Sequence, residues 1–153
     1  MHKIIVITIG FLLVVILPSC GVSQITVLND LSLVLQLDQS HGEVGKPIEI
    51  SFTVIRTKSG GPPLGLLEAP EGEPVIDIIA GDGVTVWSVQ QPPDRIPHSL
   101  NLAPGESTTI RMIWIPGPEL DRQRVTISGI LRLKGVTGLQ PTQIQLPIGE
   151  TRF

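Results

Sequence analysis

The chain has 153 residues and a formal net charge of −3, from 11 basic and 14 acidic side chains. The basic residues do not cluster, so nucleic acid is not expected as a partner. With one cysteine, the chain can form neither an internal disulfide nor a cysteine cluster that binds a metal. Only 3% of the residues are aromatic, so the core must consist mainly of Val, Ile and Leu, which favour β-strands.

The first residues of the chain have the pattern of an export signal. Lys3 precedes an uncharged segment, residues 4–17, in which only Thr8 is polar. As a helix this segment would rise about 21 Å, which is shorter than the ~30 Å hydrocarbon core of a bilayer. A basic start followed by a short apolar stretch is typical of a secretory signal peptide. We therefore expect residues 1–19 to be a signal peptide.

The only cysteine, Cys20, stands where this signal would end. Leu17-Pro18-Ser19-Cys20 resembles the lipobox of bacterial lipoproteins, although Pro18 departs from the usual pattern. The resemblance implies cleavage before Cys20 and a diacylglyceryl group on its thiol. The protein would then be exported and attached to a bacterial membrane through this lipid anchor. Residues 20–30 would form a lipidated tether between the membrane and the domain.

Two other interpretations of this region remain open. No charged residue occurs between Ile4 and Asn29, so an uncleaved membrane anchor could extend to Leu28. Alternatively, Gly21-Val22-Ser23 could serve as an ordinary cleavage site and release a soluble protein. Burial of Cys20 as a small apolar residue fits less well, because it lies outside any strand pattern.

The rest of the chain, residues 31–153, alternates apolar and polar residues in short segments separated by turn sequences. Period-two alternation predicts strands with one buried and one exposed face. Asp82-Gly83 predicts a hairpin, and Ala103-Pro104-Gly105-Glu106 predicts a type II turn. No segment has a sustained helical period, so we expect one antiparallel β-sandwich. The expected strands are residues 31–37, 48–54, 75–79, 84–89, 109–114, 125–133 and 143–148.

Two segments rich in proline, residues 57–74 and 90–99, are predicted to be surface loops. The first contains Leu64, Leu66 and Leu67, which allow two interpretations. They could fold back and cap the sandwich, because exposed apolar surface is costly. They could instead form a partner-binding loop, in which the prolines restrict the backbone and lower the entropic cost of binding.

Candidate catalytic and metal-binding residues are few, so we expect no enzyme, no metal and no cofactor. His41 and His98 are too few for a zinc site unless the fold supplies carboxylates. Asp94, His98 and Ser99 have the residue types of a hydrolytic triad, but they lie together in one loop without a glycine-framed nucleophile. Trp87 and Trp114 each close a predicted strand, where they could pack in the core or anchor a binding site.

Several segments of the body of the chain form a recognisable combination: residues 43–50, 75–78, 82–83, 86–88, 100–107 and the strand that ends at Trp114. In this combination the body resembles the BsuPI-type domain, an immunoglobulin-like fold named after a bacterial intracellular proteinase inhibitor. The resemblance spans residues 31–134 and rests on several segments in combination. It implies an immunoglobulin-like sandwich and proteinase inhibition, without assigning any inhibitory residue. The sequence thus predicts a lipid-anchored module that binds another protein, either a protease or an envelope component. The alternative is a structural envelope lipoprotein without inhibitory activity.

Overall fold

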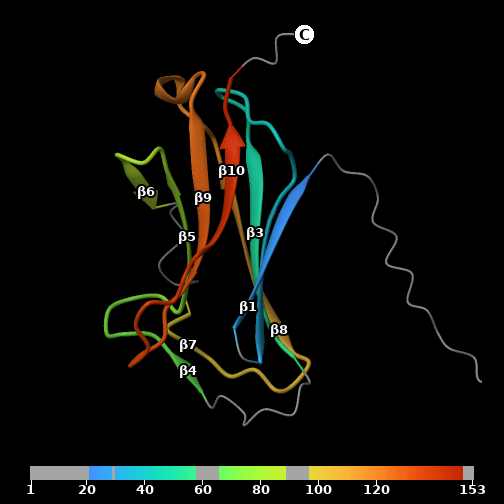
Figure 1. The fold of residues 1–153 in the computed structure, drawn as a ribbon, viewed down its shortest axis with the longest axis vertical. Helices are drawn as coiled ribbons and strands as arrows, with labels where there is room; N and C mark the ends of the chain where they lie inside the picture. The colour runs from blue at the N-terminus through green and yellow to red at the C-terminus, as the bar shows by residue number, and fades with distance from the viewer. Residues whose placement is uncertain (1–20, 29, 58–65, 89–96, 150–153) are drawn as a thin grey trace, which may run out of the picture.

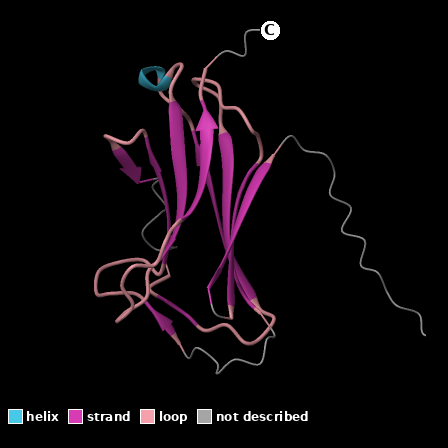
Figure 2. Ribbon diagram, viewed as in Figure 1, coloured by secondary structure: helices cyan, strands magenta, loops and turns pink. Residues whose placement is uncertain are grey.

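A computed structural model describes residues 21–28, 30–57, 66–88 and 97–149. The predicted signal peptide and Cys20 lie outside these residues, so their assignment stays a prediction. The described part of the chain consists of β-strands, loops and one short 3-10 turn, η2 (Pro118–Leu120). Figure 2 shows this all-β composition. Within the described residues, no helix has the length and apolar character required to cross a membrane.

The strands form two antiparallel four-stranded sheets and one small two-stranded sheet (Figure 1). The first sheet has the order β1-β2-β3-β8, with β1 Val22–Leu28, β2 Leu31–Leu37, β3 Ile48–Arg56 and β8 Ser107–Trp114. The second has the order β10-β9-β5-β6, with β5 Ile76–Gly81, β6 Val86–Ser88, β9 Arg124–Leu131 and β10 Thr142–Pro147. The small sheet pairs β4 (Leu67–Glu68) with β7 (Ser99–Leu100).

The core lies between the two large sheets and follows the alternation in the sequence. Every second residue of β2 and β3 is buried, and so are alternate residues of β5, β9 and β10. These side chains form one hydrophobic cluster. Phe52 is fully buried against Gly129, where an added Cβ atom would lie only 2.5 Å from the ring. The prediction of an all-β fold with antiparallel strands is confirmed.

Both predicted turns are present. The β5–β6 hairpin turns around Gly83 and Val84, one residue later than Asp82-Gly83, with Asp82 N donating to Thr85 O at 3.3 Å. In the β5–β6 hairpin, Asp82 Oδ1 accepts hydrogen bonds from the backbone N–H groups of Thr85 (2.6 Å) and Val84 (2.8 Å). These two hydrogen bonds, that from Thr85 foremost, lower the pKa of the Asp82 carboxyl below its usual range because they stabilise the charged form. In the other turn, Gly105 has φ +88°, and Glu106 N donates to Ala103 O at 2.9 Å, as a type II turn requires.

Three segments differ from the sequence-based expectation. Within residues 20–30, the expected tether, residues 22–28 form β1, which pairs with β2 along its whole length. Most side chains of β1 are exposed, so backbone hydrogen bonds to β2 hold the strand in place more than burial does. The expected loops at 57–74 and 90–99 contribute β4 and the first residue of β7.

The strand registers define two ends of the sandwich. Val22, Leu37, Ile50 and Met112 form one row across the first sheet at the end where β1 begins. We call this the proximal end, and it lies at the top of Figure 1. Where β1 ends, Leu28 pairs with Leu31, which pairs with Arg56. We call this the distal end. The six residue steps from Ile50 to Arg56 along β3 separate these two rows by about 20 Å.

Candidate functional site

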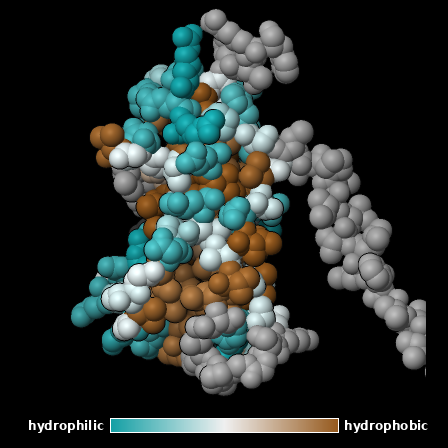
Figure 3. All heavy atoms as spheres, viewed as in Figure 1, coloured by the Kyte–Doolittle hydropathy of each residue, from teal (hydrophilic) through white to brown (hydrophobic). Residues whose placement is uncertain are grey.

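The structure places the two described leucines of the candidate binding loop in opposite environments at the distal end. Leu67 lies in β4 opposite Leu100 and is only 6% exposed, so it caps the core. Leu66, directly before it, is 55% exposed. Leu64 lies outside the described residues. On the face shown in Figure 3, hydrophobic surface gathers toward this distal end, while the opposite end around η2 is largely hydrophilic.

Backbone hydrogen bonds hold the segment that follows Leu66 from both sides. Ala69 N donates to His98 O at 3.0 Å, continuing the pairing of β4 with β7. On the other side, Lys134 N donates to Glu68 O at 2.7 Å. The backbone next to Leu66 is therefore fixed before any partner arrives, which reduces the ordering that binding would require.

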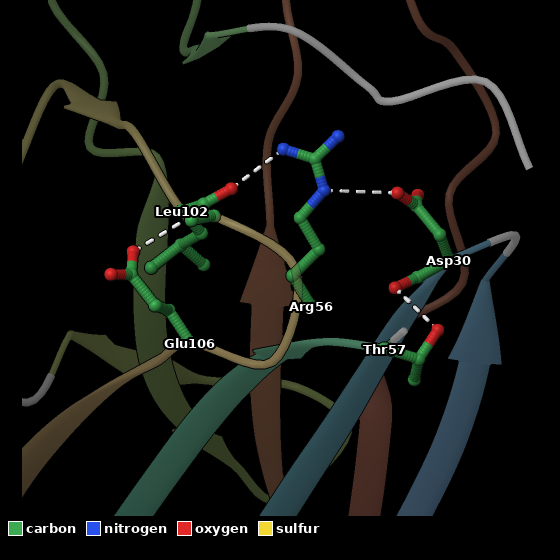
Figure 4. Close-up of polar contacts among 6 residues, drawn as sticks. Asp30, Arg56, Thr57, Leu102 and Glu106 are labelled. Carbon is green, nitrogen blue, oxygen red and sulfur yellow. Dashed lines mark hydrogen bonds and ion pairs between the residues drawn. The ribbon is translucent and has the colours of Figure 1, made fainter. Parts of the chain in front are cut away.

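A buried ion pair lies at the same end of the sandwich (Figure 4). Arg56 Nε donates to Asp30 Oδ2 at 3.1 Å, and Arg56 Nη1 donates to Leu102 O at 2.6 Å. Asp30 is 5% exposed and Arg56 is 7% exposed. The Asp30 carbonyl oxygen also accepts hydrogen bonds from Thr57 N (2.6 Å) and Thr57 Oγ1 (2.9 Å). These contacts join the β1–β2 turn, the end of β3 and the segment before β8.

The ion pair does not use all of its hydrogen-bonding capacity. Within the described part of the chain, Asp30 Oδ1 and Arg56 Nη2 are buried without a hydrogen-bond partner. A buried charge costs free energy unless it is paired. Removal of either Asp30 or Arg56 would therefore leave the other as a buried charge without its partner. The sequence held a signal for this pair: Arg56 continues the inward positions of β3 after Phe52 and Val54. A charged residue at an inward position requires a buried partner.

A second group of charges borders the distal end on the second sheet. Arg132 contacts Glu73 through Nε and Asp77 through Nη1, both at 3.0 Å. His98 Nδ1 forms a hydrogen bond with the Glu73 carbonyl oxygen at 3.0 Å. These partly exposed contacts provide a polar rim of the kind that surrounds the apolar centre of a protein interface.

Among the candidate residues that the structure describes, none assemble into a chemical site. His41 hydrogen-bonds with the carbonyl oxygen of Gly149 at the proximal end, whereas His98 lies at the distal end. Across the described ranges, no three His, Cys, Asp or Glu residues are grouped so as to hold a metal ion. Of the triad types, His98 and Ser99 are adjacent in sequence and Asp94 lies outside the described residues. Trp114 is partly buried and packs against the core.

No protein-family model matches the chain, and no match was found among curated proteins or solved structures. The resemblance to the BsuPI-type domain and the lipobox assignment therefore stay predictions. The function has to be argued from the residues and geometry of this chain.

Proposed function

We propose that this chain is an exported bacterial lipoprotein, attached to a membrane through Cys20, whose immunoglobulin-like domain binds another protein at its distal end. The lipobox-like sequence ending at Cys20 supports the anchor. Its position also fits the fold, since β1 begins two residues later at the proximal end. The distal end then points away from the membrane.

The order of the strands supports an immunoglobulin-like topology. Counted from β2, the strands β2, β3 and β8 occupy the places of A, B and E in one sheet. The strands β5, β9 and β10 occupy the places of C, F and G in the other, and β6 adds a strand next to β5. This distribution supports the immunoglobulin-like assignment, because the immunoglobulin sandwich divides its strands between two sheets in the same way, apart from strand D. β1 is an additional edge strand.

The exposed side chain of Leu66 is the observation that carries the binding proposal. A leucine at 55% exposure, on a backbone held by hydrogen bonds and beside a polar rim, has the arrangement of apolar centre and polar rim that is found in protein interfaces. Val136, in the turn after β9, is another exposed aliphatic residue at this end. A proteinase is the partner class that the BsuPI-type resemblance implies, and the action on it would be inhibition.

Capture from an envelope extract of the bacterium that carries this chain tests the proposal. A soluble form, residues 21–153, keeps β1 whole and serves as the bait. We expect it to retain a protein that Leu66→Ser no longer retains, because the substitution removes apolar contact area without touching the core. Val84→Ser is the matched control: Val84 is an exposed aliphatic residue at the tip of the β5–β6 hairpin, remote from Leu66.

The outcomes separate the candidate functions. Loss of capture with Leu66→Ser and retention with Val84→Ser support the distal site. Reduced activity of a captured protease identifies an inhibitor, and capture without inhibition identifies a binding module of another kind. A bait that captures nothing specific contradicts the proposal and favours a structural envelope lipoprotein.

A further inference from the structure

The proximal end carries a group of exposed aliphatic side chains at the β8 edge of the first sheet. Ile113 is 69% exposed, and Ile115, two residues further along the chain, is exposed as well. Gly45 N donates to Pro116 O at 2.9 Å, which brings the exposed Val44 next to this segment. We call Val44, Ile113 and Ile115 the proximal cluster. Single exposed aliphatic residues are common on protein surfaces, but a group of them marks a contact surface.

This cluster lies at the same end of the sheet as Val22, the first residue of β1. Val22 and Met112 belong to the same row across the sheet, and Ile113 is one step nearer the end. In sequence, only Gly21 stands between Val22 and Cys20. The strands β1 and β8 are the two edges of the sheet, three strand spacings or about 14 Å apart. The chain that leads to the predicted anchor therefore leaves from the β1 edge of the sheet, and the cluster lies at the β8 edge, both at the proximal end.

We propose that the proximal cluster is a membrane-contact surface that inserts into the interfacial layer of the bilayer and fixes the orientation of the domain. The inference rests on the proposed lipid attachment at Cys20. With that attachment, only Gly21 separates the acylated residue from β1, so the proximal end cannot move away from the headgroups. Apolar side chains held there gain by entering the boundary between headgroups and acyl chains, to a depth of about 5–10 Å.

The charges around the cluster indicate an apolar contact and not attraction to anionic lipid. Lys46 forms an ion pair with Glu43, and Glu49 pairs with Ile113 across the strands β3 and β8. Arg111 lies two residues before Ile113 on the same exposed face of β8. The two basic residues, Lys46 and Arg111, are balanced by Glu43 and Glu49, whereas recognition of anionic lipid depends on clustered Lys and Arg. Insertion should therefore take place in vesicles of phosphatidylcholine alone.

The test uses the full lipidated protein in phosphatidylcholine vesicles that contain nitroxide-labelled lipid. Lipidation blocks the thiol of Cys20, so Ile113→Cys introduces the only reactive thiol for an environment-sensitive fluorophore. Val136→Cys is the matched control, because Val136 is an exposed aliphatic residue (49%) at the distal end. We expect the nitroxide lipid to quench the probe at position 113 several-fold more strongly than the probe at 136. Thermal unfolding checks that both variants fold.

The results distinguish a failure of the membrane-contact proposal from a failure of the lipid attachment on which it rests. Equal quenching at positions 113 and 136, with Cys20 blocked, overturns the membrane-contact surface and leaves lipid attachment intact. A probe at 113 that is shielded from water but not quenched by the lipid also overturns it, because a second copy of the chain would then cover the cluster. Labelling of the wild-type protein at Cys20 shows that the lipid is absent, and both proposals then fail.

Discussion

Removal of Arg56 should destabilise the domain more than most single substitutions. In Arg56→Met the aliphatic part of the side chain is retained, while the guanidinium group that contacts Asp30 and Leu102 is lost. The Asp30 carboxylate, already lacking a partner for Oδ1 within the described residues, would then be buried without its cation. Arg56 therefore tests whether the ion pair holds the distal end together.

The expected magnitude follows from the geometry of the pair. Charges 3.1 Å apart attract each other by about 5 kcal/mol at an effective dielectric constant of about 20. Breaking a buried pair by removing one partner costs about 3–5 kcal/mol. This is a large part of the 5–15 kcal/mol that is typical of a whole domain. For a domain of this size, the melting temperature should fall by an amount on the order of 10–20 °C.

Urea unfolding of residues 21–153 measures this effect, with Asp30→Asn/Arg56→Met as the matched control. The double variant removes both charges, so it should recover a substantial part of the stability lost in the single variant. A loss below about 1 kcal/mol, the usual range for an exposed pair, would refute the reasoning. So would a double variant that is no more stable than Arg56→Met.

Four further substitutions test other parts of the structure. Gly129→Ala should destabilise the domain by about 1–3 kcal/mol, seen as a lower urea midpoint, because the added Cβ would meet the buried Phe52 ring at 2.5 Å; unchanged stability would contradict this packing. The pKa of the Asp82 carboxyl is lowered in the folded state, so the charged carboxylate stabilises the domain above the unfolded-state pKa. This stabilisation is lost as the pH falls through the folded-state pKa. Asp82→Ala should therefore lower stability at pH 7 and flatten its acid dependence below about pH 4, and an unchanged pH profile would argue against this. Leu67→Ala should cost about 2–5 kcal/mol as a core truncation, whereas Leu66→Ala should leave the melting temperature nearly unaltered; equal effects would mean that the two leucines share one environment.

The sequence predicted most of the sheets because the longer buried strands each carry their own periodic pattern. Leu31 to Leu37 alternate with Ser32, Val34 and Gln36, and the structure buries the leucines of this run. The turns at Asp82-Gly83 and Ala103–Glu106 were predictable for a similar reason, since their geometry depends on local residue types. The short connection between β5 and β6 also makes their antiparallel pairing predictable, whereas the β3–β8 and β5–β9 pairs join strands that are far apart in the chain.

Features that depend on distant segments were not predictable in this way. β1 has mostly exposed side chains, so its sequence lacks a buried face, and its pairing with β2 could not be inferred from alternation. β4 is a two-residue strand that depends on β7 and on the backbone of Lys134. The different environments of Leu66 and Leu67 follow from that pairing. The position of Ile113 at the end where the chain leaves toward Cys20 emerges only from the register of four strands.

The central claim is lipid attachment at Cys20, because the orientation of both ends of the domain depends on it. Mass spectrometry of the N-terminal peptide of the protein, isolated from the membranes of a bacterial host, tests it most directly. The account predicts a peptide that begins at Cys20 and carries the mass of a diacylglyceryl group, and Cys20→Ala should abolish both the cleavage and the added mass. A mature chain that begins at another residue, or a Cys20 with an unmodified thiol, would contradict the account.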